Sequence, residues 1–466
     1  MVFSSILFLF YFFIPVVLGY YALPKKCRNV WLLIASLIFY AWGEPKYILL
    51  MLFSAVFNFM AGYFVDKNRD NDKIAKLWVV IACVVDLGLL VVFKYLGFFM
   101  SGFMHLLSSN AAIFNLALPI GISFYTFQAL SYVIDVYRDD AQVQKNIVSF
   151  SLYLSMFPQL IAGPIVRYGD VAIQLNEREE TFEKFATGMV RFSVGVAKKV
   201  LIANNIGKLW SMISGMDFSG MSMGWAWLGV FAFGMQLYFD FSGYSDMAIG
   251  LGKMFGFDFI ENFNYPYISK SGTEFWRRWH ISLGTWFREY VYIPLGGNRC
   301  SKFHATMNVL AVWALTGLWH GACWNYVLWG IYFGVILIIE KNFLLKQLEK
   351  TPAFVQYIYM ILIVAVSWVL FGNENTQSMG YHLKALFNVP SLFSYDPTLI
   401  YNIMSYGVLI IVAIIGATPL PGKIMAKITK GNDLATIKLV LSVVGLFICI
   451  AYLVDDSYNP FLYFRF

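Results

Sequence analysis

Two histidines in the stretch from Phe275 to Gly330 are the side chains of this chain best suited to proton transfer. His320 lies in GLWHGACWNYVLWG, and no Asp, Glu, Lys or Arg occurs from residue 305 to residue 339. Burial favours the neutral, proton-accepting form of an imidazole, whose ordinary pKa is about 6.5. Because ionisable groups inside apolar spans are rare and usually functional, we predict that His320 is a general base. The alternative is a structural histidine that bonds to a backbone carbonyl or to Tyr326.

His280 precedes it in FWRRWHISL, beside Arg277 and Arg278. If this segment is one helix, Arg277, His280 and Gly284 share a face, which suits an anionic ligand. The alternative is an amphipathic helix at the membrane interface whose arginines extend toward water. Both histidines lack matched Asp, Glu or Cys ligands nearby, so we predict no metal site.

Carboxylates also occur inside apolar runs. Asp240 and Asp246 lie in YFDFSGYSDMAIG, and Asp86 and Asp135 lie in earlier runs. At such depth they need partners, so they either orient an imidazole or form structural pairs. The segment FPQLIAGPIVRY contains two prolines and a glycine, which predicts a broken helix that lines a polar cavity or a kinked helix end.

The composition is that of an integral membrane protein. Of 466 residues, 59% are hydrophobic and 13% are charged, whereas soluble domains have roughly 25% charged residues. The mean hydropathy is +0.65. The net charge of +7 fits basic cytoplasmic loops and anionic lipid, so we expect no nucleic-acid partner. Five scattered cysteines without a CxxC motif indicate neither a disulfide framework nor a zinc site.

Apolar stretches long enough to span a bilayer recur along the whole chain, which predicts one membrane domain over residues 1–466. We divide it into N-terminal spans (1–137), a core (138–350) and C-terminal spans (351–466). The predicted spans cover residues 2–23, 46–65, 78–97, 113–136, 185–210, 223–251, 353–371, 399–418 and 437–454.

The distribution of basic residues predicts the orientation. Lys and Arg follow the first and third apolar segments, whereas residues 101–115, 211–223 and 372–383 contain none. The positive-inside rule then places the N-terminus and the C-terminus outside. It also requires residues 305–339 to leave and re-enter the cytoplasmic side as a hairpin, with His320 near the turn.

No GxGxxG, Walker-type P-loop, GxSxG or HExxH motif is present, so nucleotide hydrolysis, serine hydrolase and zincin chemistry lack their usual signals. One remaining possibility is a transporter or flippase whose buried histidine and carboxylates relay protons. Transporters commonly contain internal repeats, and none is evident here.

With these motifs assembled, the chain resembles the membrane-bound O-acyltransferase (MBOAT) family, most closely its alginate O-acetyltransferase branch. The resemblance covers nearly the whole chain. Its motifs, in order, are MVFSSILFLF, IASLIFYAWGEPKY, PIGISFYTFQALSYVIDVYR, FPQLIAGPIVRY, YFDFSGYSDMAIGLGKMFGFDFIENFNYPY, FWRRWHISLGTWFREYVYIPLGGNR, GLWHGACWNYVLWG and NPFLYFRF.

The resemblance implies an all-α polytopic membrane protein with about eleven membrane segments around a central funnel and re-entrant helices. It implies that His320 is the family's invariant histidine and that His280 is its second polar position. No permanently bound cofactor is implied. Acetyl-coenzyme A is the implied donor, and its phosphates suit the arginines of the basic stretch, which are Arg277, Arg278, Arg288 and Arg299.

The implied reaction moves an acetyl group across the bacterial cytoplasmic (inner) membrane for O-acetylation of an extracellular polysaccharide. His320 would be the base, and His280 would position the donor or assist at its sulfur. The acceptor is either an extracytoplasmic acetyltransferase partner protein or the polysaccharide itself, and membrane lipids surround the chain. The alternative is D-alanyl transfer from a carrier protein toward teichoic acid, as in a sister branch.

Overall fold

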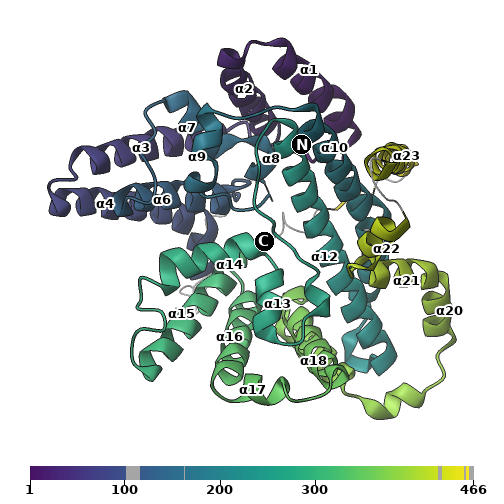
Figure 1. Cartoon of the computed structure of the whole chain (residues 1–466). Coiled ribbons are helices and arrows are strands. Elements are labelled where there is room, and N and C mark those ends of the chain that lie inside the picture. Colours follow the sequence, from purple (N-terminus) through teal and green to yellow (C-terminus); the bar gives the residue numbers. More distant parts are fainter. Residues whose placement is uncertain (101–115, 162, 429–432, 456–457, 461–466) are drawn as a thin grey trace. The chain divides into compact units, whose positions relative to one another are not determined.

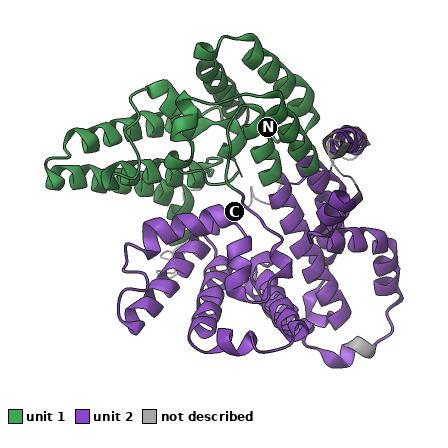
Figure 2. Cartoon of the chain, viewed as in Figure 1, with its two compact units in different colours: residues 1–194, 244–260 green, residues 195–243, 261–466 purple. Residues whose placement is uncertain are grey.

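The computed structural model describes residues 1–100, 116–161, 163–428, 433–455 and 458–460, and within them every regular element is a helix (Figure 1). The predicted all-α class is therefore confirmed. His105, to which the sequence assigns no chemistry, lies outside these residues. The chain divides into two compact units (Figure 2). Unit 1 comprises residues 1–194 and 244–260, and unit 2 comprises residues 195–243 and 261–466.

Unit 1 holds the N-terminal helices, of which α3 packs on α4 and α6, and α2 packs on α7. Four phenylalanines, Phe3, Phe8, Phe39 and Phe157, form one buried cluster in it. Its elements are η1 (Leu7–Phe13), α1 (Ile14–Ala22), α2 (Lys25–Gly43), α3 (Ile48–Lys67), α4 (Asp72–Leu90), η2 (Val91–Tyr95), α6 (Ile122–Arg138), α7 (Ile147–Ser155), α8 (Phe157–Leu160), α9 (Tyr168–Asn176) and most of α10 (Phe182–Ala197).

The predicted helix break in FPQLIAGPIVRY is present. α7 ends at Ser155, Met156 is non-helical with φ −54° and ψ 113°, and α8 lasts four residues with Pro158 in its first turn. The Nε2 atom of Gln159 donates to the backbone oxygen of Tyr153 at 2.5 Å. In a continuous helix the Tyr153 oxygen would accept from Phe157, but the N–H of Phe157 donates to Oγ of Ser36 at 3.1 Å, and the Gln159 side chain takes its place.

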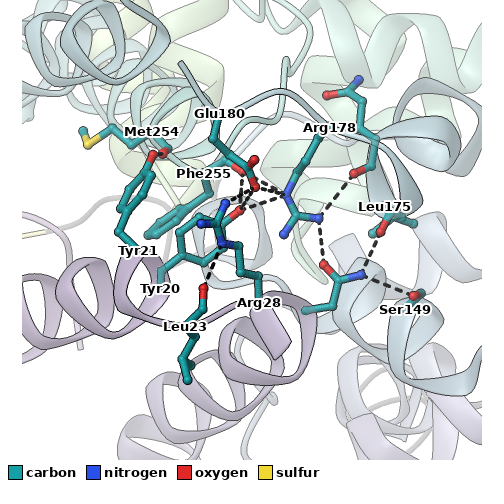
Figure 3. A network of polar contacts seen from close by, with 12 residues as sticks. Tyr20, Tyr21, Leu23, Arg28, Ser149, Leu175, Arg178, Glu180, Met254 and Phe255 are labelled. Atoms are coloured by element: carbon teal, nitrogen blue, oxygen red, sulfur yellow. Dashed lines mark hydrogen bonds and ion pairs between the residues drawn. The ribbon is translucent and has the colours of Figure 1, made fainter. Parts of the chain in front are cut away.

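A buried ionic cluster surrounds Glu180 in unit 1 (Figure 3). The Oε1 atom of Glu180 accepts the Tyr20 hydroxyl at 2.7 Å and lies 3.0 Å from Nη1 of Arg28. Arg178 donates from Nε to the Tyr20 hydroxyl at 2.9 Å and to the backbone oxygen of Phe255 at 3.1 Å. The cluster therefore joins the α1–α2 corner, the segment after α9 and the end of α12.

Charge pairing in this cluster also sets the pKa of Glu180. Its burial acts to raise the pKa, but hydrogen bonds from Tyr20 and Arg28 and the charges of Arg28 and Arg178 outweigh that effect. The pKa of Glu180 therefore lies below its ordinary value of 4.5, and the carboxylate stays ionised at neutral pH.

Unit 2 has an aromatic core that includes Phe275, Trp279, Trp329, Trp368 and Phe371. The 32-residue helix α12 (Met223–Met254) begins in it and ends in unit 1. The other elements are the end of α10, η3 (Lys198–Ala203), α11 (Asn204–Ser214), η4 (Phe218–Gly220), η5 (Pro266–Ile268), α13 (Gly272–Arg278), α14 (Ile281–Phe287), η6 (Arg288–Tyr292), α15 (Lys302–His320), α16 (Trp324–Ile339), η7 (Glu340–Leu344), α17 (Leu345–Leu348), α18 (Ala353–Gly372), α19 (Thr376–Leu386), η8 (Val389–Phe393), α20 (Pro397–Ser405), α21 (Gly407–Gly416), α22 (Leu420–Ile428) and α23 (Asp433–Asp455).

Several helices are long and apolar enough to cross a membrane. Among the described residues there are five, and α20 with α21 adds a sixth if that pair, bent by 56°, is one span. The five are Ile48–Lys67, Asp72–Met100, Trp324–Leu348, Ala353–Gly372 and Thr436–Asp455. The multi-pass character is thus confirmed. The count of about eleven segments and the division into three parts stay predictions.

The buried carboxylates of the apolar runs contact basic or amide side chains. Asp240 lies 2.8 Å from Nζ of Lys199, and Asp246 lies 2.8 Å from Nη2 of Arg191. Asp86 accepts from Nδ2 of Asn58 at 3.0 Å. These contacts support structural pairing rather than orientation of a catalytic imidazole.

Candidate functional site

The hairpin of α15 and α16 positions His320, as predicted. α15 ends at His320, and α16 begins four residues later at Trp324. Two glycines allow the helices to approach closely. A Cβ atom on Gly317 would lie 2.3 Å from the backbone oxygen of Tyr326, and one on Gly330 would lie 2.3 Å from that of Trp313. No side chain fits at either position, so the sequence around His320 is fixed by packing.

Aromatic rings enclose His320, which is 6% exposed. Its ring centroid lies 5.1 Å from that of Trp319, 5.1 Å from that of Trp329 and 5.3 Å from that of Phe371. His320 lines a cavity of about 10 Å³, about the size of one water molecule. The other lining residues are Leu237, Phe241, Trp279, Trp329, Trp368 and Phe371.

The segment FWRRWHISL does not form the single helix whose face sharing was considered from its spacing. α13 ends at Arg278, α14 begins at Ile281, and His280 between them has a left-handed φ of 45°. The physical reason is a pair of backbone hydrogen bonds to an earlier segment. Asn264 donates to the oxygen of Arg278 at 2.9 Å, and Ile281 donates to the oxygen of Asn262 at 3.0 Å. These bonds hold a conformation that non-glycine residues seldom adopt.

The side chain of Asn262 fixes the state of the His280 ring. Its Oδ1 atom accepts the backbone N–H of Ser282 at 3.2 Å and lies 3.1 Å from Nδ1 of His280. Because a backbone N–H can only donate, this atom of Asn262 is the amide oxygen, and it requires a proton on Nδ1 of His280. The lone pair of His280 is therefore on Nε2, which has no hydrogen-bond partner among the described residues.

Burial also keeps His280 neutral. The side chain is 1% exposed, and burial lowers its pKa to about 3. At physiological pH the ring is therefore a hydrogen-bond and proton acceptor through Nε2, and it has no second proton to donate from that atom.

His280 lines a cavity of about 690 Å³ whose lining includes three basic side chains. These are Arg277, Arg288 and Lys341. Gly284 also lines it, so the residues predicted to share a helix face meet in one cavity although the helix is broken. The combination of a large volume, three cations and a neutral imidazole suits an extended anionic ligand.

The four arginines predicted to contact the donor do not lie together. Arg277 and Arg288 line the cavity, whereas Arg278 and Arg299 are not among its lining residues. Arg278 binds Glu274 at 2.9 Å and the backbone oxygen of Asn264 at 3.0 Å. Arg299 is exposed in a turn. Nothing in the structure tests the donor role itself, so the assignments of these residues stay predictions.

Sequence reasoning missed several residues of this site. Lys341 lines the cavity and donates to the side-chain oxygen of Asn298, another lining residue. Asn262 was unassigned, although it lies in the quoted motif ENFNYPY. The sequence shows Asn262 only as an asparagine among aromatic residues, and this pattern does not predict its contact with His280, eighteen positions later.

Trp319 lies against both histidines. Its ring centroid is 5.9 Å from that of His280 and 5.1 Å from that of His320. Phe241 contacts His280 at 4.8 Å and also lines the small cavity at His320. Trp319 and Phe241 thus connect the surroundings of the two histidines, which lie close together in unit 2.

Known proteins resemble this chain over most of its length. A protein of Pseudomonas aeruginosa described as probable alginate O-acetylase AlgI is 44% identical over 393 residues, which cover 83% of this chain and 75% of that protein. The peptidoglycan O-acetyltransferase of Helicobacter pylori is 33% identical over 422 residues, with 83% and 80% covered. The teichoic acid D-alanyltransferase of Bacillus subtilis is 25% identical over 339 residues, with 69% and 82% covered.

The family model described as MBOAT, membrane-bound O-acyltransferase family, matches residues 37–372. This range includes the basic cavity, His280, His320 and the aromatic rings between them. The prediction of a membrane-bound O-acyltransferase is thereby confirmed: the chain belongs to the MBOAT family.

Proposed function

We propose that this enzyme transfers an acetyl group from cytoplasmic acetyl-coenzyme A to a hydroxyl group on the outer side of a bacterial cytoplasmic membrane. The main support is the cavity of about 690 Å³ that presents Arg277, Arg288 and Lys341 and reaches His280. Coenzyme A carries several phosphates and a long flexible arm, which match the cations and the volume of this cavity. The relatives described as O-acetylases and O-acetyltransferases support acetyl as the transferred group.

His320 acts as the general base in this proposal. Its imidazole takes the proton from the acceptor hydroxyl while the hydroxyl oxygen bonds to the thioester carbonyl carbon. The carbon–sulfur bond then breaks, and the leaving thiolate takes the proton from the imidazolium of His320. The products are an acetyl ester and free coenzyme A, so atoms and charges balance.

His280 positions the donor rather than protonating its sulfur. Its proton is on Nδ1 and is directed to Asn262, so Nε2 offers only a lone pair. A neutral acceptor of this kind suits an amide N–H of the pantetheine arm near the thioester. This choice between the two roles predicted for His280 follows from the tautomer.

The acceptor is an extracellular polysaccharide, reached directly or through an extracytoplasmic acetyltransferase partner protein. The relatives described as acting on alginate and peptidoglycan support a glycan as the final acceptor. With the N- and C-termini outside, the positive-inside rule places the basic stretch of residues 253–304, and with it the donor cavity, on the cytoplasmic side. The acetyl group thus crosses the membrane within the protein.

The donor can be tested with purified protein in lipid nanodiscs. The protein is incubated with radiolabelled acetyl-coenzyme A or with a D-alanyl-loaded carrier protein, and bound label and free thiol are measured. The proposal predicts saturable binding of acetyl-coenzyme A, lost in excess unlabelled coenzyme A, and release of free thiol when an acceptor glycan is added. A stable complex with the loaded carrier protein, with no binding of acetyl-coenzyme A, would replace it with D-alanyl transfer.

A further inference from the structure

A second cavity in unit 2 is independent of the proposed chemistry. It has a volume of about 400 Å³ and lies among α12, the segment of residues 266–275, α18 and α21. Its lining is mostly aliphatic and aromatic and includes Phe231, Met235, Met360, Val364 and Trp368. No charged side chain is among the lining residues.

The position of this cavity along α18 places it in the hydrocarbon layer. α18 is apolar and long enough to cross a membrane, and two cavity residues on it are partly exposed, Tyr357 by 39% and Ile361 by 57%. Eleven helical steps separate Tyr357 from Trp368, which corresponds to about 16 Å along the axis. This is about half of a hydrocarbon core of about 30 Å, and both residues lie four positions from an end of α18, so the cavity is centred in the hydrocarbon layer.

Polar groups gather at the end of the cavity near Tyr357. The side chain of Tyr357 and the residue Ser269 belong to its lining, and Nζ of the exposed Lys270 lies 6.0 Å from the centre of the Tyr357 ring. A cation at one end of an apolar cavity suits an amphipathic ligand with an anionic head.

The other end of the cavity approaches the small cavity of His320. Trp368 lines this cavity and also the small cavity of His320, so its indole is a wall shared by both. Phe275 lies beside it, with ring centroids 6.4 Å apart. The two cavities are therefore neighbours, and we assign the ligand of the larger one a structural role rather than a part in acyl transfer.

We propose that this cavity binds one acyl chain of an anionic phospholipid, with the lipid phosphate at Lys270. The apolar lining and the position within the hydrocarbon layer account for the acyl chain, and the charge of Lys270 accounts for the head group. The inference rests on the membrane location of α18 and does not depend on the donor, the acceptor or the roles of the histidines.

The experiment uses the full-length protein in phosphatidylcholine nanodiscs that contain a small fraction of phosphatidylglycerol with a photoreactive diazirine in its acyl chain. Irradiation and peptide mass spectrometry then locate the adducts. We expect them on the cavity-lining parts of α12 and α18, including Phe231, Met360 and Val364. A phosphatidylcholine probe with the same chain should label these peptides less.

Three variants test the site. Val364→Trp fills the cavity and should remove most of the lipid labelling. Ala365→Leu adds a smaller side-chain volume and should lower the labelling partly. Lys270→Ala should lower the preference for phosphatidylglycerol about fivefold, which is the effect of one lysine at an anionic membrane surface. Matched controls are Ile358→Trp, which is on α18 outside the lining, and the exposed Lys350→Ala.

Folding of each variant is checked by size-exclusion chromatography, and Ala365→Leu is the test if Val364→Trp does not fold. Adducts spread evenly over exposed helix faces would overturn the proposal. Labelling that is unchanged in both Val364→Trp and Ala365→Leu would also overturn it. Equal labelling by the phosphatidylglycerol and phosphatidylcholine probes, with or without Lys270, would do the same. Displacement of the lipid probe by acetyl-coenzyme A would assign the cavity to the donor instead.

Discussion

Asn262 holds His280 in a single tautomer, because its side-chain oxygen is 3.1 Å from Nδ1 of His280 and also accepts the N–H and the hydroxyl of Ser282. Three contacts on one amide oxygen fix the ring without a charge. His280 thereby faces the basic cavity as a neutral acceptor. In the proposed function this relationship sets the role of His280, and it can be tested separately from His320.

Removal of the Asn262 amide should impair transfer without loss of the fold. In Asn262→Leu the Nδ1 proton of His280 keeps only the Ser282 hydroxyl, 3.4 Å away, as an acceptor, so the ring also populates the other tautomer, and we expect transfer to fall roughly tenfold. The rate of acetyl transfer by the protein in nanodiscs measures this. The exposed neighbour variant Asn264→Leu is the control and should retain activity.

The variant Asn262→Asp tests whether Asn262 acts by orienting the His280 ring or only by filling space. The carboxylate keeps the acceptor for Nδ1, but its negative charge raises the pKa of His280 from about 3. Activity should therefore be retained at high pH and lost on acidification at a higher pH than in the wild type. A pH profile with the wild-type inflection would contradict the positioning role.

The basic side chains of the cavity should act on donor binding. Alanine at Arg277, Arg288 or Lys341 should raise the KM for acetyl-coenzyme A roughly tenfold each while kcat changes little, because a charge-assisted hydrogen bond contributes about 1.5 kcal/mol. The effect should weaken at high salt. Arg299→Ala, at an exposed arginine outside the lining, is the control. An equal KM effect there would indicate a diffuse surface charge effect instead.

The neutral state of His280 predicts acid destabilisation in a defined pH range. Between pH 6.5 and about 3 the unfolded chain binds a proton at this residue and the folded chain does not. The free energy of unfolding should therefore fall by about 1.4 kcal/mol per unit as the pH drops below 6.5. Thermal unfolding of the wild type and of His280→Gln at several pH values measures it. The glutamine variant should have the shallower dependence, and identical slopes would contradict a buried, neutral His280.

Glu180 should stabilise unit 1 through its charge. Its side chain is 5% exposed and lies next to Arg28 and Arg178, so Glu180→Gln should lower the free energy of unfolding by about 3 kcal/mol. The exposed neighbour variant Glu179→Gln is the control. Because the folded pKa of Glu180 is below 4.5, the stabilisation is complete above pH 4.5 and is lost as the pH falls through that folded pKa. The variant and the wild type should therefore converge in acid, and a difference independent of pH would point to packing rather than charge.

The hairpin of α15 and α16 was predictable because its signals are local. A run without charged residues, bounded by basic segments, must form membrane helices, and the turn falls at His320. The break at His280 was not predictable. Residues 275–287 contain no proline, and the left-handed φ depends on bonds from Asn262 and Asn264, which belong to another segment.

The positions of the basic side chains relative to the cavity also could not be predicted from the sequence alone. Arg277 and Arg278 are adjacent and identical in type, and only Arg278 has the i,i+4 spacing to Glu274 that pairs them within α13. That Arg277 lines the cavity depends on the fold. Lys341 reaches the cavity from η7, which follows α16 and lies far from the basic stretch in sequence. Contacts between distant segments therefore decide which charges form the site.

The central claim is that His320 is the base for acyl transfer, and its most direct test is the acetyl ester content of the cell-surface polysaccharide in a His320→Ala strain. The control is His304→Ala, which changes an exposed histidine on the same helix, and both proteins are confirmed in the membrane by immunoblot. We predict that acetyl esters are lost with His320→Ala and retained with His304→Ala, while the polysaccharide itself is still exported. Unchanged acetyl content in the His320→Ala strain would contradict the assignment of the base.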